Sequence, residues 1–140
     1  GLPFDHVGAV PYGGLPLATA VALAAAASMV WPRPQVKDHG TAQPVEGDWK
    51  PGDRVVLIDD VVTSGASAVE ATQRLRDNGL VVEHLIVLVE RHPDARHRLA
   101  DAGIALHAVM TLAGLAGDLA ASGRIDAATR AAIAAPVVEP

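Results

Sequence analysis

The stretch Asp53-Arg-Val-Val-Leu-Ile-Asp-Asp-Val-Val-Thr-Ser-Gly-Ala-Ser67 decides the fold. Within it, Val55–Ile58 is a short apolar run rich in β-branched residues, which is typical of a strand buried on both faces. Two carboxylates, Asp59 and Asp60, follow this run, and a loop of small residues comes next. We therefore predict a buried strand that delivers two acidic side chains to a loop.

A helix is predicted after the loop, over residues 67–78. Ser67 is its expected N-cap, and Glu70 stands three residues later as the capping-box partner. At the other end, Gly79 suits the left-handed position that follows a helix. The sequence thus predicts a strand, a loop and a helix in close succession.

Such an arrangement is suited to a phosphate. Loop amides and hydroxyls beside a helix N-terminus bind anions, and the helix dipole adds roughly 0.3–1 kcal/mol. Gly65 allows the backbone to approach an oxyanion closely. Because Asp59 and Asp60 would repel a bare phosphate, we expect a ribose diol or a hydrated Mg²⁺ between them, since Mg²⁺ takes one or two carboxylates together with substrate phosphates. These features favour a phosphorylated sugar as the ligand.

The stretch resembles the phosphoribosyl-pyrophosphate (PRPP) motif of type I phosphoribosyltransferases. The resemblance implies that Asp59 and Asp60 hold the ribose hydroxyls, that both are candidate Mg²⁺ ligands, and that the loop holds the 5′-phosphate. It assigns PRPP contacts to Val61, Val62, Thr63, Ser64, Gly65, Ala66 and Ser67. Mg²⁺ is then expected to enter with PRPP.

Residues 32–48 form a long polar stretch interrupted by prolines, which indicates a functional or disordered loop. Within it, residues 33–40 resemble the flexible catalytic loop of orotate phosphoribosyltransferases. The resemblance implies that Arg33, Lys37 and His39 contact the pyrophosphate of PRPP across the interface of a homodimer. We expect Lys37 and His39 to act in catalysis together with the two acidic residues of the PRPP motif.

Two residues depart from the family pattern. Pro34 stands where the family loop has Lys, which removes one pyrophosphate-binding cation and stiffens the loop. The segment containing Tyr12 and Gly13 resembles the family's pyrophosphate loop, but Gly13 stands where many bacterial members have Lys. Tyr12 and Gly13 are still expected to bind PRPP, because a turn of backbone amides can bind an anion without that Lys.

The base is expected to contact two residues. Arg91 follows an apolar run at 85–89, and orotate enzymes have an Arg at this place that pairs with the orotate carboxylate. An Arg guanidinium matches a planar carboxylate through two parallel hydrogen bonds. Thr63 is expected near both the sugar and the base.

The rest of the chain alternates short apolar runs with helical patterns. This alternation predicts an α/β fold with a central parallel sheet flanked by helices. The resemblance specifies a type I phosphoribosyltransferase (Rossmann-like) core in a single domain over residues 1–140. It also implies an N-terminal hood over the base, which we expect to be missing from a chain that begins without Met. Further strands are expected at 7–10, 28–31, 85–89 and 104–110, and helices from Pro16, at 94–101, at 112–119 and at 126–135, the last capped by Asp126.

Composition excludes several functions. The net charge is −5 and no basic patch is evident, so we expect no nucleic-acid partner. The apolar segment 15–30 is too short for a membrane span, and we expect no membrane association. The chain has no cysteine, which is consistent with a cytoplasmic enzyme. The remaining histidines lack ligand spacing and are interpreted as structural or solvated: His6, His84, His92, His97 and His107.

We interpret the sequence as an orotate phosphoribosyltransferase with PRPP, orotate and Mg²⁺ as ligands. One alternative is a phosphoribosyltransferase for another base. A second is a PRPP- or nucleotide-binding regulator with little catalysis, which Pro34 and Gly13 favour. A phosphoacceptor receiver domain also places acidic residues at strand ends, but Thr63–Gly65 directly after them does not fit that class.

Overall fold

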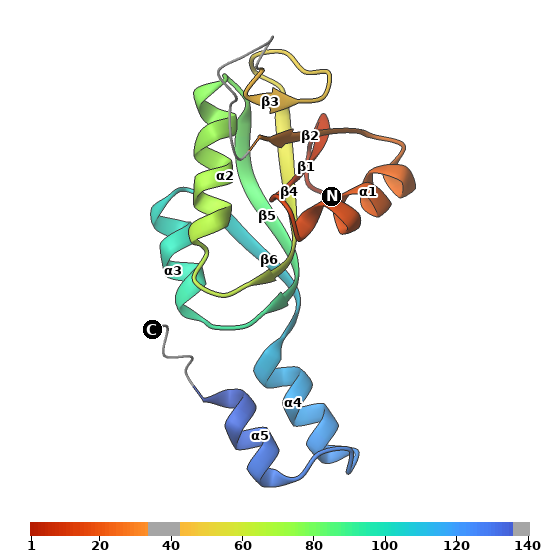
Figure 1. Cartoon of the computed structure of the whole chain (residues 1–140), viewed down its shortest axis with the longest axis vertical. Coiled ribbons are helices and arrows are strands. Elements are labelled where there is room, and N and C mark those ends of the chain that lie inside the picture. Colours follow the sequence, from red (N-terminus) through yellow and green to blue (C-terminus); the bar gives the residue numbers. More distant parts are fainter. Residues whose placement is uncertain (34–42, 136–140) are drawn as a thin grey trace.

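A mixed six-stranded sheet with the strand order β3-β2-β1-β4-β5-β6 forms the body of the molecule (Figure 1). The computed structural model describes residues 1–33 and 43–135. The strands are β1 His6–Ala9, β2 Ser28–Pro32, β3 Val45–Glu46, β4 Arg54–Val62, β5 Val81–Glu90 and β6 Ala105–Thr111. The helices are α1 Gly14–Ala25, α2 Ala66–Asp77, α3 Asp94–Asp101, α4 Leu112–Ala121 and α5 Ala127–Ala134.

The α/β fold expected from the sequence is confirmed, with one correction. Strands β1, β2, β4, β5 and β6 pair in parallel, but β3 pairs antiparallel with β2, so the sheet is not wholly parallel. Val45 and Glu46 form this edge strand inside the stretch that was predicted to be loop, and Pro32 belongs to β2. Pro32 is tolerated there because it is the last residue of its strand.

The central strand β4 is buried because its side chains alternate between two apolar layers. Val55 and Leu57 pack toward α2 and α3, whereas Val56 and Ile58 pack toward α1. Figure 1 shows α2 and α3 on one face of the sheet and α1 on the other. This alternation continues into the acidic pair, so Asp59 is directed to the α2 side and Asp60 to the α1 side.

The ends of α2 differ in how well the sequence predicts them. The helix begins at Ala66, with Gly65 as its N-cap in a left-handed conformation and without a side-chain cap, so the predicted Ser67 cap is wrong. The C-terminal prediction is confirmed. Gly79 has φ +88°, its N–H donates to Arg76 O, and Leu80 N–H donates to Leu75 O, which is the Schellman arrangement.

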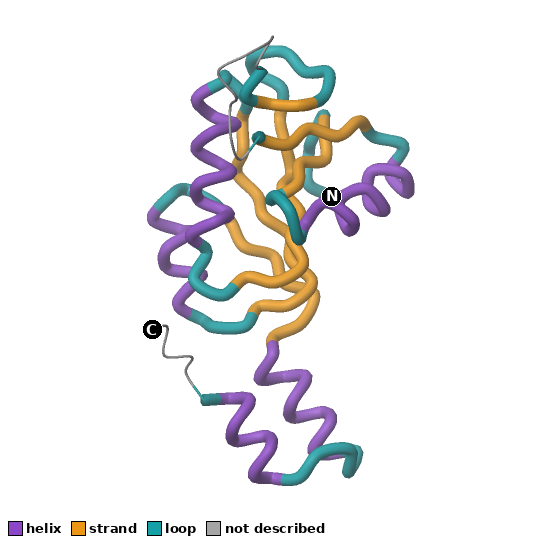
Figure 2. Tube along the Cα trace, viewed as in Figure 1, coloured by secondary structure: helices purple, strands orange, loops and turns teal. Residues whose placement is uncertain are grey.

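The two last helices form a hairpin that extends from the end of β6, away from the sheet (Figure 2). The predicted cap of α5 is confirmed, since Asp126 Oδ1 accepts a hydrogen bond from Thr129 N at 2.7 Å. Within the described part of the chain, no helix combines the length and apolar character required to cross a bilayer.

Candidate active site

The strand order reverses between β1 and β4. From β1 the chain continues to β2 on one side, whereas from β4 it continues to β5 and β6 on the other. In open α/β sheets, ligands bind beyond the carboxyl ends of the strands at such a switch point. The segment after β1 is held against β4 by a hydrogen bond from Val10 N to Ile58 O at 3.1 Å. The acidic pair and the Gly13 turn therefore lie at the place where this fold binds ligands.

Asp59 is buried at this switch point, with 8% of its surface exposed. Its pKa is raised to about 7, mainly by burial and also by the neighbouring Asp60 carboxylate, against the opposing effect of the Asp60 N–H. That N–H donates to Asp59 Oδ1 at 2.9 Å. The Asp59 carboxyl group therefore exchanges its proton close to neutral pH, as acid–base and ligand-binding groups often do.

Asp60 is exposed and lies against the turn after β1. Its Oδ1 accepts a hydrogen bond from Val61 N at 2.8 Å. A Cβ atom added to Gly13 would lie 2.9 Å from the same oxygen, so Gly13 leaves room for the carboxylate. Gly14 approaches β4 even more closely, because a Cβ there would lie 2.5 Å from Ile58 O. The structure thus brings together Gly13 and Asp60, which are far apart in the sequence.

The loop between β4 and α2 surrounds a hollow of about 240 Å³. This volume would hold roughly eight waters at the density of the liquid. Gly65 has φ +80°, and this conformation turns the chain from the strand into the helix. The hollow is lined by Asp59, Val61, Val62, Thr63, Ser64, Gly65, Ala66, Ser67 and Ala68. Eight of these nine residues were predicted from the sequence, and Ala68 was not.

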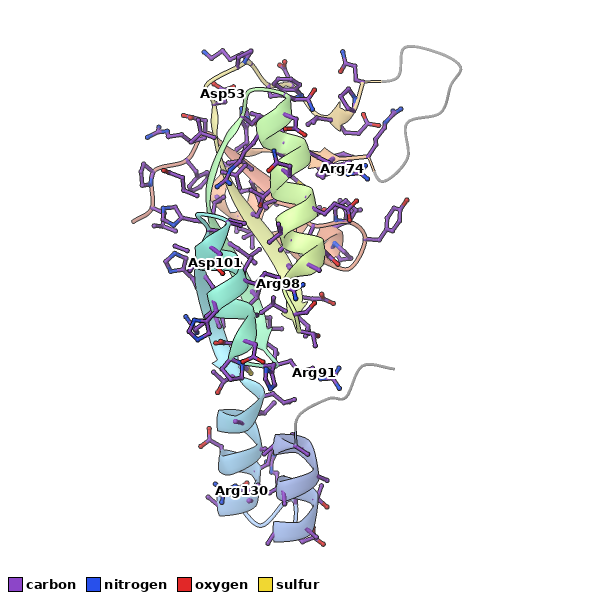
Figure 3. The ribbon with its side chains drawn as sticks, turned by 90° about the vertical axis from the view of Figure 1, so that its left-hand side faces the viewer. Asp53, Arg74, Arg91, Arg98, Asp101 and Arg130 are labelled. Carbon is purple, nitrogen blue, oxygen red and sulfur yellow. The ribbon has the colours of Figure 1, made fainter. Side chains whose placement is uncertain are left out.

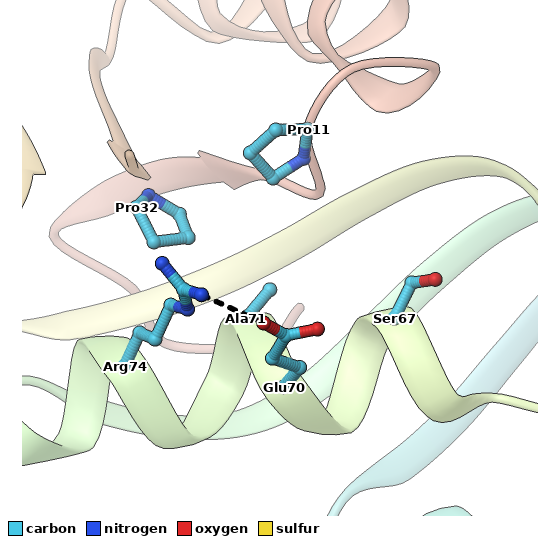
Figure 4. Close-up of a pocket in the computed structure, with 6 residues that line it drawn as sticks. All are labelled: Pro11, Pro32, Ser67, Glu70, Ala71 and Arg74. Atoms are coloured by element: carbon cyan, nitrogen blue, oxygen red, sulfur yellow. Dashed lines mark hydrogen bonds and ion pairs between the residues drawn. The ribbon is translucent and has the colours of Figure 1, made fainter. Parts of the chain in front are cut away.

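A second, smaller hollow of about 110 Å³ lies beside the first and shares Ser67 with it (Figure 4). On the α2 side of this hollow, Arg74 Nη2 donates to Glu70 Oε1 at 2.7 Å, and Arg74 Nη1 donates to Arg33 O at 2.6 Å. Sequence reasoning missed this pair because it gave Glu70 a capping role. The i,i+4 spacing of Glu70 and Arg74 was the available signal.

The predicted catalytic loop is described only at its roots. The Arg33 guanidinium forms an ion pair with Glu46, and Arg33 N donates to Pro44 O at 2.9 Å. Arg33 does not line either hollow, and its contact with PRPP stays a prediction. Lys37 and His39 lie outside the described residues.

Thr63 and Arg91 are the two residues predicted to contact the base. Their backbones lie close together, but the two residues line different hollows. Arg91 N donates to Val62 O at 2.9 Å, which places Arg91 beside the residue that precedes Thr63. Thr63 faces the hollow at α2, whereas Arg91 lines a hollow of about 190 Å³ with Thr111 and Ala113. Figure 3 shows Arg91 projecting outward near the lower end of the sheet. Joint recognition of the base by both residues stays a prediction.

Metal-ligating side chains are sparse. Among residues 1–33 and 43–135, no group of three or more His, Asp or Glu side chains is placed to hold a metal ion. Asp59 and Asp60 supply two carboxylates, of which Asp60 is the exposed one. Two carboxylates with substrate phosphates match the usual ligand set of Mg²⁺. The site therefore fits a magnesium ion that arrives with a phosphorylated substrate.

Comparison with known proteins shows which enzymes the chain is similar to. No protein-family model matches the chain. Uridine 5′-monophosphate synthase from Bos taurus is 41% identical over 126 residues, covering 90% of this chain and 26% of that protein. Orotate phosphoribosyltransferase from Cenarchaeum symbiosum is 38% identical over 122 residues, covering 87% of this chain and 61% of that protein.

The solved structures that resemble this chain include the same two kinds of protein, a UMP synthase and an orotate phosphoribosyltransferase. Leishmania donovani UMP synthase superposes with a TM-score of 0.83 and 35% identity, covering 94% of this chain and 28% of that one. Mycobacterium tuberculosis orotate phosphoribosyltransferase in complex with PRPP superposes with a TM-score of 0.68 and 27% identity, covering 81% of this chain and 66% of that one.

The fold is therefore that of the phosphoribosyltransferases, as the sequence predicted. Within this class, the chain is related to the orotate phosphoribosyltransferases and to the corresponding part of UMP synthases. It spans about a quarter of the Bos taurus protein and about three fifths of the Cenarchaeum symbiosum protein.

Proposed function

We propose that the chain carries out the orotate phosphoribosyltransferase reaction, in which orotate and PRPP give orotidine 5′-monophosphate and pyrophosphate during UMP biosynthesis. One observation supports this most directly. The hollow formed by the loop before α2 opens beside Asp59 at the switch point of the sheet. The relatives' names and the PRPP complex of the Mycobacterium tuberculosis protein support the same substrates.

In this proposal PRPP extends along the carboxyl ends of β4 and β1. Its 5′-phosphate occupies the hollow of residues 63–67, where the first N–H groups of α2 and the Ser64 and Thr63 hydroxyls are available as donors. The ribose diol lies against Asp59 and Asp60, and the pyrophosphate lies toward Gly13. We place the groups of PRPP in this order because the Asp59 carboxylate is directed toward α2 and the Asp60 carboxylate toward Gly13.

Mg²⁺ belongs to this proposal as a group held by the PRPP phosphates and by Asp60, with Asp59 as a second candidate. When bound, it would neutralise negative charge on the pyrophosphate leaving group. Cleavage of the C1–oxygen bond leaves a positively charged ribose and a negatively charged pyrophosphate. Cations directed at the leaving group stabilise this transition state more than the ground state. Lys37, His39 and Arg33 are the candidates.

The proposal includes a homodimer in which the loop of one subunit acts at the site of the other. It also includes a cytoplasmic location. Arg33 would have to leave Glu46 to reach a pyrophosphate. The side chains of this ion pair are both partly exposed, so their separation costs little. Lys37 and His39 lie outside the described residues, and we expect them to carry the greater part of the effect on the leaving group.

The test is a turnover assay with PRPP, Mg²⁺ and orotate, run beside a panel of other bases. Formation of orotidine 5′-monophosphate with orotate alone is the expected result. Turnover with a different base would mean that this base, and not orotate, is the substrate. PRPP binding by calorimetry without turnover of any base would instead favour a regulator.

Replacing Lys37 with Ala should lower kcat by more than about tenfold, or about 1.4 kcal/mol, with a smaller change in PRPP affinity. The reason is that a loop cation is expected to act on charge that develops only in the transition state. Steady-state kinetics measures the effect. The control is Lys50→Ala, which removes an exposed Lys near the amino end of β4. Equal kcat values for the two variants would refute the role of Lys37.

Replacing Arg91 with Ala should raise KM for orotate by about tenfold and leave PRPP affinity unchanged. Arg91 is exposed at the end of β5, and its removal deletes a charge-assisted contact with the carboxylate of the base. Arg98→Ala, an exposed Arg on α3 (Figure 3), is the matched control. Similar losses for both ligands in Arg91→Ala would argue against base recognition.

A further inference from the structure

Two histidines meet on the open face of β5 and β6. The register pairs His84 with Ala105 and Ile86 with His107, so the two imidazoles stand diagonally on the same face of the sheet. Leu85 and Leu106 point to the opposite face, toward the core under α2 and α3. His107 is exposed and His84 is partly exposed.

The open face around the pair is apolar. Leu88 and Val109 continue it toward the carboxyl ends of the strands and are 41% and 67% exposed. The helix on this side of the sheet, α1, packs on β1 and β4 (Figure 1). Solvent and ions therefore reach the imidazoles directly.

The two rings present nitrogen atoms to each other. His84 Nδ1 and His107 Nε2 are 3.3 Å apart, and the ring centroids are separated by 5.3 Å with an interplanar angle of 54°. This distance is at the long end of the range for a hydrogen bond, and its donor depends on the tautomers of the two rings. A metal ion bound by both nitrogens would take the place of the proton that they share.

The same distance suits a metal ion. Zinc–nitrogen bonds are about 2.0–2.1 Å long, and two ligands at a tetrahedral angle then lie about 3.3–3.4 Å apart. Neighbouring ligands of a square-planar ion would lie closer, at about 2.9 Å. We propose that His84 and His107 bind Zn²⁺ as a two-ligand surface site, with water completing the tetrahedron.

This site is separate from the proposed PRPP site. His84 lies in the first half of β5, whereas Asp59 and the loop before α2 lie at the carboxyl ends of the strands. A bound Zn²⁺ would link β5 to the edge strand β6. Because the metal binds the folded pair of strands and not two separated residues, it should stabilise the fold.

The test uses the 140-residue chain without an affinity tag, freed of metal with a chelator and titrated with ZnCl₂. Calorimetry should give one Zn²⁺ per chain, and saturating Zn²⁺ should raise Tm by several degrees. His84→Ala and His107→Ala should each weaken binding by at least about tenfold, since loss of even a supporting group around a metal costs about 10–100-fold. His97→Ala, an exposed His on α3, should bind like the unmodified chain.

Metal-free circular dichroism and Tm establish that each variant is folded. A measurement without variants accompanies them: the ring signals of His84 and His107 in the NMR spectrum of the unmodified chain should shift with Zn²⁺, and that of His97 should not. The proposal is overturned if the unmodified chain binds no Zn²⁺, if a variant carrying both His84→Ala and His107→Ala binds as tightly as the parent, or if the ring signals of the pair do not shift.

Discussion

Asp59→Asn is expected to stabilise the chain at neutral pH and to lower phosphoribosyl transfer by about 10- to 100-fold. Loss of function follows because a carboxylate that holds a ribose hydroxyl makes a charge-assisted hydrogen bond of about 1.5–3 kcal/mol. The gain in stability follows from burial, which raises the Asp59 pKa to about 7. An Asn of the same shape keeps an acceptor for Asp60 N and carries no charge to bury.

The sign of the pH dependence is fixed by the direction of this shift. The folded state holds a proton on Asp59 up to about pH 7, whereas the unfolded chain releases it near the ordinary aspartate pKa of 3.8. Folding therefore loses stability as pH rises from about 4 to 7 and then levels off. The stability difference between Asp59→Asn and the parent should grow over the same range, by up to about 4 kcal/mol.

Thermal or urea unfolding of both proteins between pH 4 and 8 measures this difference. Asp101→Asn, which changes an exposed carboxylate at the end of α3 (Figure 3), is the control and should track the parent at every pH. A difference that stays constant with pH, or an Asp59→Asn protein less stable than the parent at pH 8, would contradict the raised pKa. Unchanged turnover would instead contradict the proposed contact with the ribose.

The central strand shows how far local pattern predicts the fold. The apolar run at 55–58 was recognised, but β4 continues through the acidic pair to Val62. The sequence suggested that the strand ends at the carboxylates, because charged residues are unusual inside a buried strand. Pairing with β5, through Val61 with Val89 and Val62 with Glu90, extends it. That pairing depends on a partner some 30 residues away, which no local pattern contains.

The start of α2 was misjudged for a related reason. Ser67 with Glu70 has the spacing of a capping box, yet Glu70 forms an ion pair with Arg74 one turn later. Both interactions are compatible with the sequence, but the helix has its N-cap at the left-handed Gly65, two residues before the predicted cap. The sequence motif nevertheless predicts most of the residues that line the hollow, because nearly all of them follow one another in the chain and belong to the same loop.

The β3 edge of the sheet could not be predicted from the sequence. Strand β3 contains only Val45 and Glu46, and it pairs antiparallel with the end of β2. Two residues carry no detectable periodicity. The ion pair of Glu46 with Arg33 likewise joins residues on either side of a proline-containing stretch. The proximity of the Gly13 turn to the acidic pair was predicted, by contrast, because both segments follow expected parallel strands, and the order of those strands confirms it.

Gly65→Val is expected to lower PRPP affinity by about 100-fold and to destabilise the fold by about 3–4 kcal/mol. Gly65 has φ +80°, a conformation that costs other residues about 1–2 kcal/mol and β-branched residues the most. An added Cβ would also lie 3.3 Å from Leu99 Cγ, so the side chain overpacks the contact with α3. Relief of this strain would move the loop and the first N–H groups of α2 away from the phosphate.

Gly123→Val separates backbone strain from the effect on the site. Gly123 has φ +69°, and a Cβ added to it meets no atom within 4 Å. It lies between α4 and α5, apart from the hollow at α2. This variant should therefore lose about 1–2 kcal/mol of stability and keep the PRPP affinity of the parent.

Urea unfolding and PRPP calorimetry, at a temperature where both variants are folded, give the two quantities. If the loop before α2 binds the 5′-phosphate, PRPP affinity should fall only in Gly65→Val, and inorganic phosphate should show the same difference with a smaller amplitude. Equal PRPP affinities in the two variants would mean that the phosphate binds elsewhere. The comparison matters because loss of stability alone would lower apparent binding in both variants, whereas displacement of the loop lowers it in one.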